Sequence, residues 1–167
     1  ILTEDGNFPT DLYVAQGLNR NHPDPPEVKV CASRDELIDS FNTDTAIVYL
    51  SHADYRSGEC WNMADINHRA HTIDALTVWD LSHSTGAIPV DLTGDDADFA
   101  VGCGYKYLSA GPGGSAYLWV NPRHAESGWP TICGWMGHQD VFAFATEYEP
   151  LSGAGRHATG TPAVIAL

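Results

Sequence analysis

Basic residues are scarce in this 167-residue sequence. Eight Lys and Arg stand against 22 Asp and Glu, which gives a formal net charge of −14 at pH 7. A surface that binds nucleic acid or an anionic membrane needs a basic stripe to displace counterions or to pair with lipid headgroups. The composition therefore argues against nucleic acid and against a membrane as partners.

Long apolar runs and paired cysteines are also missing. The apolar runs, such as residues 45–50, fall far short of the roughly 18 residues that a membrane span requires, and no charged-then-apolar leader opens the sequence. The four cysteines, Cys31, Cys60, Cys103 and Cys133, form no Cys-x-x-Cys pair. This spacing argues against a zinc ribbon or a disulfide framework. We expect a soluble, cytoplasmic protein with buried free thiols.

Both ends of the sequence are apolar. Residues 1–3 are typical of the tail of a strand, and residues 162–167 are typical of an apolar element that stops short. Natural termini are more often polar and frayed. Because 43% of the residues are hydrophobic, the chain can build one core. We expect residues 1–167 to be most of one domain of a longer protein.

Helical and strand-like stretches alternate along the chain. Apolar periodicity and capping residues predict helices over residues 11–18, 33–41 and 63–74. Thr10 or Asp11 would cap the first helix, and Ser33 with Glu36 would form a capping box for the second. Short apolar runs predict strands over residues 27–31, 45–51, 75–81, 97–103 and 114–120. The alternation favours a mainly parallel α/β sheet with crossover helices.

Polar side chains follow three of the predicted strands. Ser51 and His52 come after one, Asp80 and His83 after the next, and Tyr105 with Lys106 after the third. Open α/β sheets bind ligands beyond the carboxyl ends of their strands. We therefore expect the three groups to face one crevice.

Asp80 and Lys106 together suit pyridoxal phosphate. The aldehyde of this cofactor condenses with a lysine amine, and a carboxylate keeps its ring nitrogen protonated. Lys106 is one of only two lysines, the other being Lys29. The plain alternatives stay open at this point, because a lone lysine is usually a surface charge and an Asp after a strand often forms a turn or a helix cap.

Metal and nucleotide sites find little support. His68 and His71 share one face of the predicted helix, with Asp65 or Asp74 as further ligands. The pattern lacks the Glu of His-Glu-x-x-His and a convincing third ligand, so we expect no metal site. The glycines near Lys106 complete neither a dinucleotide-binding pattern nor a Walker pattern.

Four motifs follow one another along nearly the whole chain. They are Phe8-Pro9-Thr10-Asp11, then Trp79-Asp80-Leu81-Ser82-His83-Ser84-Thr85-Gly86-Ala87, then Gly104-Tyr105-Lys106-Tyr107-Leu108 with Gly111-Pro112-Gly113-Gly114, and finally Gly134-Trp135-Met136-Gly137-His138. In this order they resemble the kynureninase family, which belongs to the aspartate-aminotransferase-like pyridoxal-phosphate enzymes. The resemblance implies the large domain of fold-type I, a mainly parallel sheet in a three-layer αβα arrangement.

The resemblance implies roles at the cofactor ring. Lys106 would be the Schiff-base lysine, and Asp80 would pair with the pyridine nitrogen. His83 would lie near the lysine and the ring. Phe8 would stack on the ring, although an ordinary core Phe explains it as well without the resemblance. Asp11 would lie close to the cofactor's polar edge, and a helix cap is its plain alternative.

The resemblance also implies roles at the phosphate. Tyr105 would hold the phosphate through its hydroxyl and donate a proton during cleavage. Trp135 would donate its indole N–H to the same group. Thr161 would reach the phosphate from the other subunit of a homodimer. A core aromatic and a turn before proline are the plain alternatives for Trp135 and Thr161.

The implied reaction is the hydrolysis of L-kynurenine or 3-hydroxykynurenine to L-alanine and anthranilate or 3-hydroxyanthranilate, in tryptophan catabolism. The family's phosphate-binding loop, its arginine for the substrate α-carboxylate and its small C-terminal domain would lie outside residues 1–167. Two alternatives stay open: a related class V aminotransferase or cysteine-desulfurase-like enzyme, and a non-catalytic acidic domain of the same fold. Lys106 beside Asp80 favours an enzyme.

Overall fold

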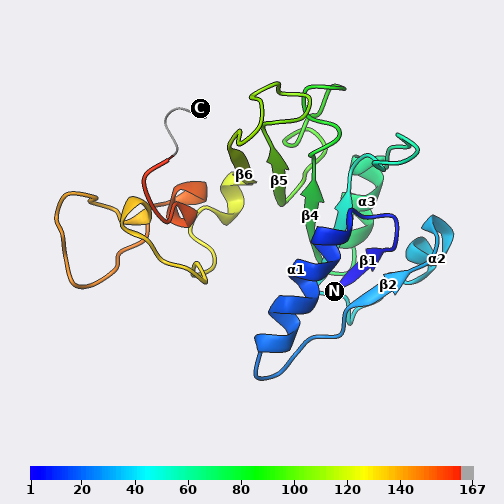
Figure 1. Cartoon of the computed structure of the whole chain (residues 1–167). Coiled ribbons are helices and arrows are strands. Elements are labelled where there is room, and N and C mark those ends of the chain that lie inside the picture. The colour runs from blue at the N-terminus through cyan, green and yellow to red at the C-terminus, as the bar shows by residue number, and fades with distance from the viewer. Residues whose placement is uncertain (163–167) are drawn as a thin grey trace.

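A six-stranded sheet lies at the centre of the computed structural model, which describes residues 1–162 (Figure 1). The strands are β1 (Leu2–Glu4), β2 (Lys29–Cys31), β3 (Ile47–Ser51), β4 (Leu76–Asp80), β5 (Phe99–Cys103) and β6 (Ala116–Val120). Their order is β2-β1-β3-β4-β5-β6. All neighbours pair in parallel except β5 and β6, which are antiparallel. The predicted mainly parallel sheet is confirmed.

Helices lie on both faces of this sheet. They are α1 (Pro9–Asn21), α2 (Arg34–Asp39) and α3 (Met63–His71). On one face, the Trp79 indole N–H of β4 donates to Asn67 of α3 at 2.8 Å. Asp80, the next residue, points to the other face because side chains alternate along a strand, and there it meets Asp11 of α1. The three-layer αβα arrangement is therefore confirmed.

The core lies between the sheet and the helices α2 and α3. Leu37 of α2 and Ile66 of α3 pack with Leu50 and Trp79 of the central strands, and all four are almost fully buried. These strands carry the apolar runs from which they were predicted. Burial on this scale stabilises a fold by about 1.5–3 kcal/mol for each large side chain.

The helix boundaries differ from the predicted ones. The second helix agrees best, since Ser33 caps it by accepting from the Glu36 N–H at 3.1 Å. The prediction that Thr10 or Asp11 caps the first helix is wrong. That helix begins at Pro9, with Phe8 in the capping position, because proline fits the first helical position without losing a hydrogen bond.

The segment after β6 extends away from the sheet (Figure 1). It contains three short 3₁₀ helices, Pro122–His124, Trp135–Gly137 and Gly153–His157. Its large apolar side chains are exposed, among them Trp129, Ile132, Trp135, Phe142 and Phe144. The apolar element predicted at the C-terminus falls on residues 163–167, outside the described part of the chain.

The four cysteines are free, as expected. Cys31 is buried and Cys103 is partly buried, but Cys60 and Cys133 are exposed. The prediction of buried thiols is therefore wrong for these two, because they lie in connecting segments and not on the core side of a strand. Within residues 1–162, no helix is both long and apolar enough to cross a membrane.

Asp98 joins several elements at the amino-terminal edge of the sheet. Its carboxylate, which is 1% exposed, accepts from the Thr77 N–H of β4 at 2.8 Å and from His71 of α3 at 2.9 Å. From the segment after β6, His124 and Arg123 also donate to it. Although burial opposes ionisation, these donors hold the pKa of Asp98 well below its usual range.

Replacing Asp98 by Asn tests this network. Removing the charge from a buried ion-pair network costs about 3–5 kcal/mol, so Asp98→Asn should lower the unfolding midpoint of the complete chain by several degrees. Asp96→Asn is the matched control, because Asp96 pairs with Arg123 and His71 but its side chain is 60% exposed. Exposed pairs contribute about 0–1 kcal/mol. Equal losses in the two variants would contradict the network.

The effect of Asp98→Asn should also depend on pH. A carboxyl group whose folded pKa is depressed contributes stability above its unfolded pKa, about 3.9, and loses that contribution as the pH falls towards the folded value. The difference in unfolding midpoint between parent and variant should therefore shrink as the pH falls below about 4. Denaturant titrations across this range measure it.

Candidate active site

The predicted polar groups meet at the carboxyl ends of β3, β4 and β5. The parallel register aligns Ser51 with Asp80, and Asp80 with Val101 of β5. The His52 N–H donates to the Asp80 carbonyl oxygen at 2.9 Å, which ties the two strand ends together. The structure brings His83 into contact with Lys106, and Asp80 lies close enough for its charge to act on His83. That all three groups face one crevice stays a prediction.

Asp80 is buried and oriented by its own turn. Its Oδ1 accepts from the Ser82 N–H at 2.9 Å and from the Ser82 hydroxyl at 2.6 Å. This is the local turn that an Asp two residues before a Ser forms. Both hydrogen bonds of the turn go to Oδ1, so the turn does not use the other carboxylate oxygen of Asp80.

Asp11 approaches Asp80 from the helix α1. The Ser51 hydroxyl donates to Asp11 Oδ2 at 3.4 Å, and the Tyr49 phenol lies near the same carboxylate. Burial, followed by the charge of Asp80, raises the pKa of Asp11 to about 6. Two carboxylates so close repel each other, so the pair favours a proton or another cationic group between them.

Lys106 lies beside His83. The Lys106 Nζ and His83 Nε2 are 3.0 Å apart. Burial and the ammonium charge of Lys106 both lower the pKa of His83, so the neutral imidazole accepts a hydrogen bond from the lysine. The same Nζ lies 5.4 Å from the centre of the Phe8 ring and 5.6 Å from that of Tyr105. The predicted residues Phe8, His83, Tyr105 and Lys106 are thus brought together.

Glycine allows the sharp bend that carries Lys106. The Gly104 N–H donates to the Ser115 carbonyl oxygen at 2.8 Å, where the chain leaves β5 and returns to β6. A Cβ atom at position 104 would lie 2.7 Å from that oxygen, closer than side chains tolerate. The motif residue Gly113 adopts a φ of 82°, which favours glycine.

A cavity of about 340 Å³ opens beside His83. Tyr55 lines it, and the edge of the Tyr55 ring faces Phe8 with the ring centres 5.3 Å apart. Arg56 and Tyr107 also contribute to its wall. Small-molecule sites usually enclose about 300–1,000 Å³, so the cavity has the size of a substrate pocket.

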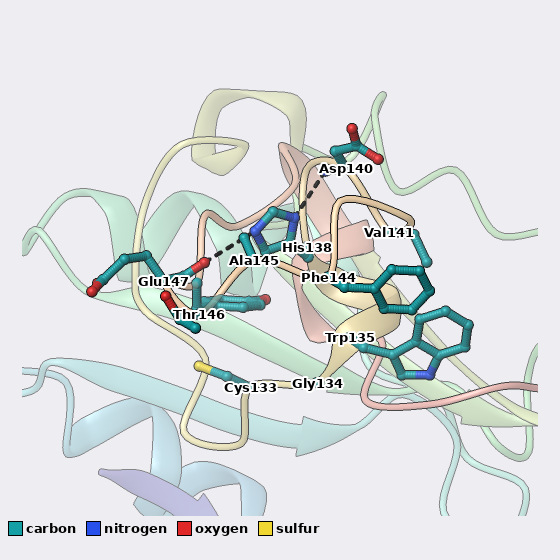
Figure 2. Close-up of a pocket in the computed structure, with 11 residues that line it drawn as sticks. Cys133, Gly134, Trp135, His138, Asp140, Val141, Phe144, Ala145, Thr146 and Glu147 are labelled. Atoms are coloured by element: carbon teal, nitrogen blue, oxygen red, sulfur yellow. Dashed lines mark hydrogen bonds between the residues drawn. The ribbon is translucent and has the colours of Figure 1, made fainter.

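Trp135 and Thr161 lie elsewhere, on the segment after β6. Trp135 lines a different cavity, of about 300 Å³, with Phe144 and Val141 beside it (Figure 2). In this cavity, the Asp140 N–H donates to His138 Nδ1 at 2.9 Å. Thr161 is exposed. Among the described residues, no hydrogen bond joins Trp135 or Thr161 to the Lys106 group, and their phosphate role stays a prediction.

Three residues of this site were not predicted from the sequence. Tyr49 shares a face of β3 with Ser51, so the alternation of the strand was a usable signal. Ser82 follows Asp80 at the spacing of a local turn. Tyr55 reaches the site through a loop that only the tertiary structure places, and no sequence signal marks it.

The histidines of the alternative metal site belong to a different arrangement. His71 pairs with Asp98 and Asp96 at the far edge of the sheet. Within the described part of the chain, no group of three or more His, Cys, Asp or Glu residues has the placement of a metal site. These contacts account for His71 as part of the structural network around Asp98.

Curated relatives of this chain are kynureninases. That of Deinococcus radiodurans is 49% identical over 167 residues, and that of Pseudomonas fluorescens is 41% identical over the same length. Each match covers 100% of this chain and 40% of the relative, so the chain spans less than half the length of these relatives. The resemblance read from the four motifs is confirmed.

Solved structures agree in fold. A cysteine desulfurase from Escherichia coli matches 98% of this chain and 41% of its own, with a TM-score of 0.77 and 20% identity. A C-DES mutant with glycine covalently linked to its PLP cofactor matches 98% of this chain and 45% of its own, with a TM-score of 0.79 and 18% identity. At this identity the likeness shows the fold alone.

A family model completes the comparison. The model described as aminotransferase class-V matches residues 25–167, which include Asp80, His83 and Lys106. Since this match covers most of the sequence, the chain belongs to the class-V aminotransferase family.

Proposed function

We propose that this chain is part of a pyridoxal-phosphate-dependent enzyme that hydrolyses L-kynurenine, or its 3-hydroxy form, to L-alanine and anthranilate, or 3-hydroxyanthranilate. One observation carries the proposal: Lys106, paired with His83, lies at the same sheet edge as the carboxylates of Asp80 and Asp11. The similarity to kynureninases over the whole chain supports the choice of substrate.

The residues present fit this cofactor. Burial and the charge of Asp80 raise the pKa of Asp11. A protonated ring nitrogen between the two carboxylates would relieve their repulsion. Lys106 supplies the amine, and the exposed face of Phe8 suits a flat ring. When bound, pyridoxal phosphate would supply an aldehyde for the lysine and an electron-withdrawing ring next to the substrate amine. No basic field is needed, which agrees with the net charge of −14.

The chain's own groups would control the protons of the reaction. Ser82 holds the Asp80 carboxylate in one orientation. Neutral His83 accepts from Lys106 and so orients the amine, which acts as the base once it is free. The Tyr105 hydroxyl would donate a proton during cleavage of the Cβ–Cγ bond, after water has added to the γ-carbonyl. Such general acid catalysis accelerates a step by roughly 10²–10⁴-fold.

The substrate would occupy the cavity beside His83. Tyr55 and Ile88 give it an apolar wall for an aryl group, and Arg56 offers N–H donors. Arg56 is held by Asp54 at 3.2 Å. The family's arginine for the substrate α-carboxylate would come from residues outside this chain.

The phosphate and the dimer complete the proposal. Tyr105 and Trp135 would contact the phosphate, with Thr161 arriving from a second subunit. The exposed aromatic side chains of the segment after β6 support a homodimer, because a monomer seldom leaves so many in one region exposed. Residues 1–167 would form most of the large domain, and the four free cysteines agree with a cytoplasmic location.

Cysteine-desulfurase-like chemistry is the second candidate. One observation favours it, since exposed Cys60 lines the cavity beside His83. The identity to kynureninases favours the first candidate. Formation of alanine from cysteine, with sulfide freed from the resulting persulfide by an added thiol reductant, would decide for the second if Cys60→Ser abolishes it.

Lys106→Ala tests the cofactor. Adding pyridoxal phosphate to the complete chain should produce a visible absorption band, which Lys106→Ala should abolish because the amine is gone. Lys29→Ala is the matched control, since Lys29 is the other lysine and donates to Ser40 at 2.7 Å, at the opposite edge of the sheet. A band that survives Lys106→Ala but not Lys29→Ala would refute the assignment.

Asp11→Asn tests the carboxylate pair through pH. Asp11 takes up a proton as the pH falls through about 6, and its attraction for a protonated ring nitrogen then disappears. The affinity of the complete chain for pyridoxal phosphate should therefore weaken below about pH 6. Asp11→Asn should remove this component and leave only the dependence that arises from the cofactor's own titration. Identical pH profiles for parent and variant would contradict the role of Asp11.

Tyr105→Phe tests the reaction itself. The full-length protein that contains residues 1–167 should release fluorescent anthranilate from kynurenine, and Tyr105→Phe should lower kcat by about 10²–10⁴-fold because the proton donor is lost. Tyr13→Phe, on the exposed side of α1, is the control that should change nothing. No anthranilate from the loaded parent would exclude the proposed reaction.

A further inference from the structure

The helix α1 begins without the usual side-chain cap. Its capping residue is Phe8, which makes no capping hydrogen bond. Helices normally begin at Ser, Thr, Asp or Asn, whose side chains accept from the first free N–H groups. The helix therefore begins at Pro9 without a side-chain cap, and the position of its start relative to the sheet depends on the residues before it.

Asn7, the residue before Phe8, connects the start of the helix to the sheet. Asn7 is buried, with only 1% of its surface exposed. Its Nδ2 donates to the Thr3 hydroxyl at 2.9 Å and to the Tyr49 carbonyl oxygen at 3.1 Å, and its Oδ1 accepts from the Ser51 N–H at 2.9 Å. The amide thus joins the start of α1 to β1 and β3.

The residues that Asn7 binds are the same ones that hold Asp11. Asn7 contacts the backbone of Tyr49 and Ser51, while the Ser51 hydroxyl donates to the Asp11 carboxylate and the Tyr49 phenol lies near it. Asn7 also directly precedes Phe8, whose ring lies below the Lys106 Nζ. One buried amide therefore connects β1 and β3 to the segment that carries Phe8 and Asp11.

We propose that Asn7 is a positioning residue that places Phe8 and Asp11 where they meet a ring held by Lys106 and Asp80. The proposal rests on the proposed cofactor. Asn7 itself touches no reacting group. Replacing it by Ser removes the reach to β3, so Phe8 and Asp11 shift relative to Asp80 while the residues themselves remain.

The test compares two buried asparagines in the complete chain. Asn7→Ser is the variant, and Asn121→Ser is the matched control, because Asn121 is buried and its side chain donates to the Ala97 carbonyl oxygen at 2.7 Å and accepts from the Arg123 N–H, at the opposite edge of the sheet. Both changes should lower the unfolding midpoint. Only Asn7→Ser should weaken the affinity for pyridoxal phosphate, by at least tenfold, and move the pH at which affinity falls.

Hydrogen exchange of the cofactor-free protein supplies a readout independent of the cofactor. Peptides that cover residues 7–13 should exchange faster in Asn7→Ser than in the parent and should be unchanged in Asn121→Ser. Should Asn7→Ser fail to fold, Asn7→Gln replaces it with the same expectations, since it adds no charge and its longer side chain moves the amide away from its partners on β1 and β3.

The outcomes separate this proposal from the proposed function. If the parent binds pyridoxal phosphate and the Asn7 and Asn121 variants lose equal affinity, the role of Asn7 is overturned and the cofactor stands. If the parent does not bind it, the proposed function fails and this inference fails with it.

Discussion

The site depends on one constraint, the meeting of two carboxylates at the carboxyl ends of parallel strands. The register brings Asp80 to this edge, and α1 places Asp11 beside it. Without a cation between them the two charges repel. Tyr49, Ser51 and Ser82 hold the pair in place against that repulsion, and Lys106 lies at the same edge of the sheet.

The opposite edge of the sheet shows the reverse electrostatics. Asp98 is also a buried carboxylate, yet its pKa is depressed because groups of four residues donate to it, whereas the pKa of Asp11 is raised. A buried carboxylate with many hydrogen-bond donors stabilises the folded state when it is ionised. A buried carboxylate beside a like charge costs folding free energy when it is ionised, and a cationic ligand can offset that cost. The difference separates the structural edge from the edge proposed to bind cofactor.

The sequence predicted β3, β4 and β5 well because each is a short apolar run that the sheet buries in large part. It also placed Asp80, His83 and Lys106 at one edge, since this follows from parallel topology alone. The start of α1 was predicted too late because Phe8 takes a position that sequence rules reserve for polar residues. Tyr55 could not be found, since a loop brings it to the site. The roles of Trp135 and Thr161 rest on the family resemblance and stay predictions.

The most direct measurement of the central claim locates the bond between protein and cofactor. The complete chain would be loaded with pyridoxal phosphate, reduced with borohydride, digested and analysed by mass spectrometry. The account predicts the pyridoxyl group on Lys106 alone. A label on Lys29, the other lysine of the chain, or no label on Lys106 would contradict it.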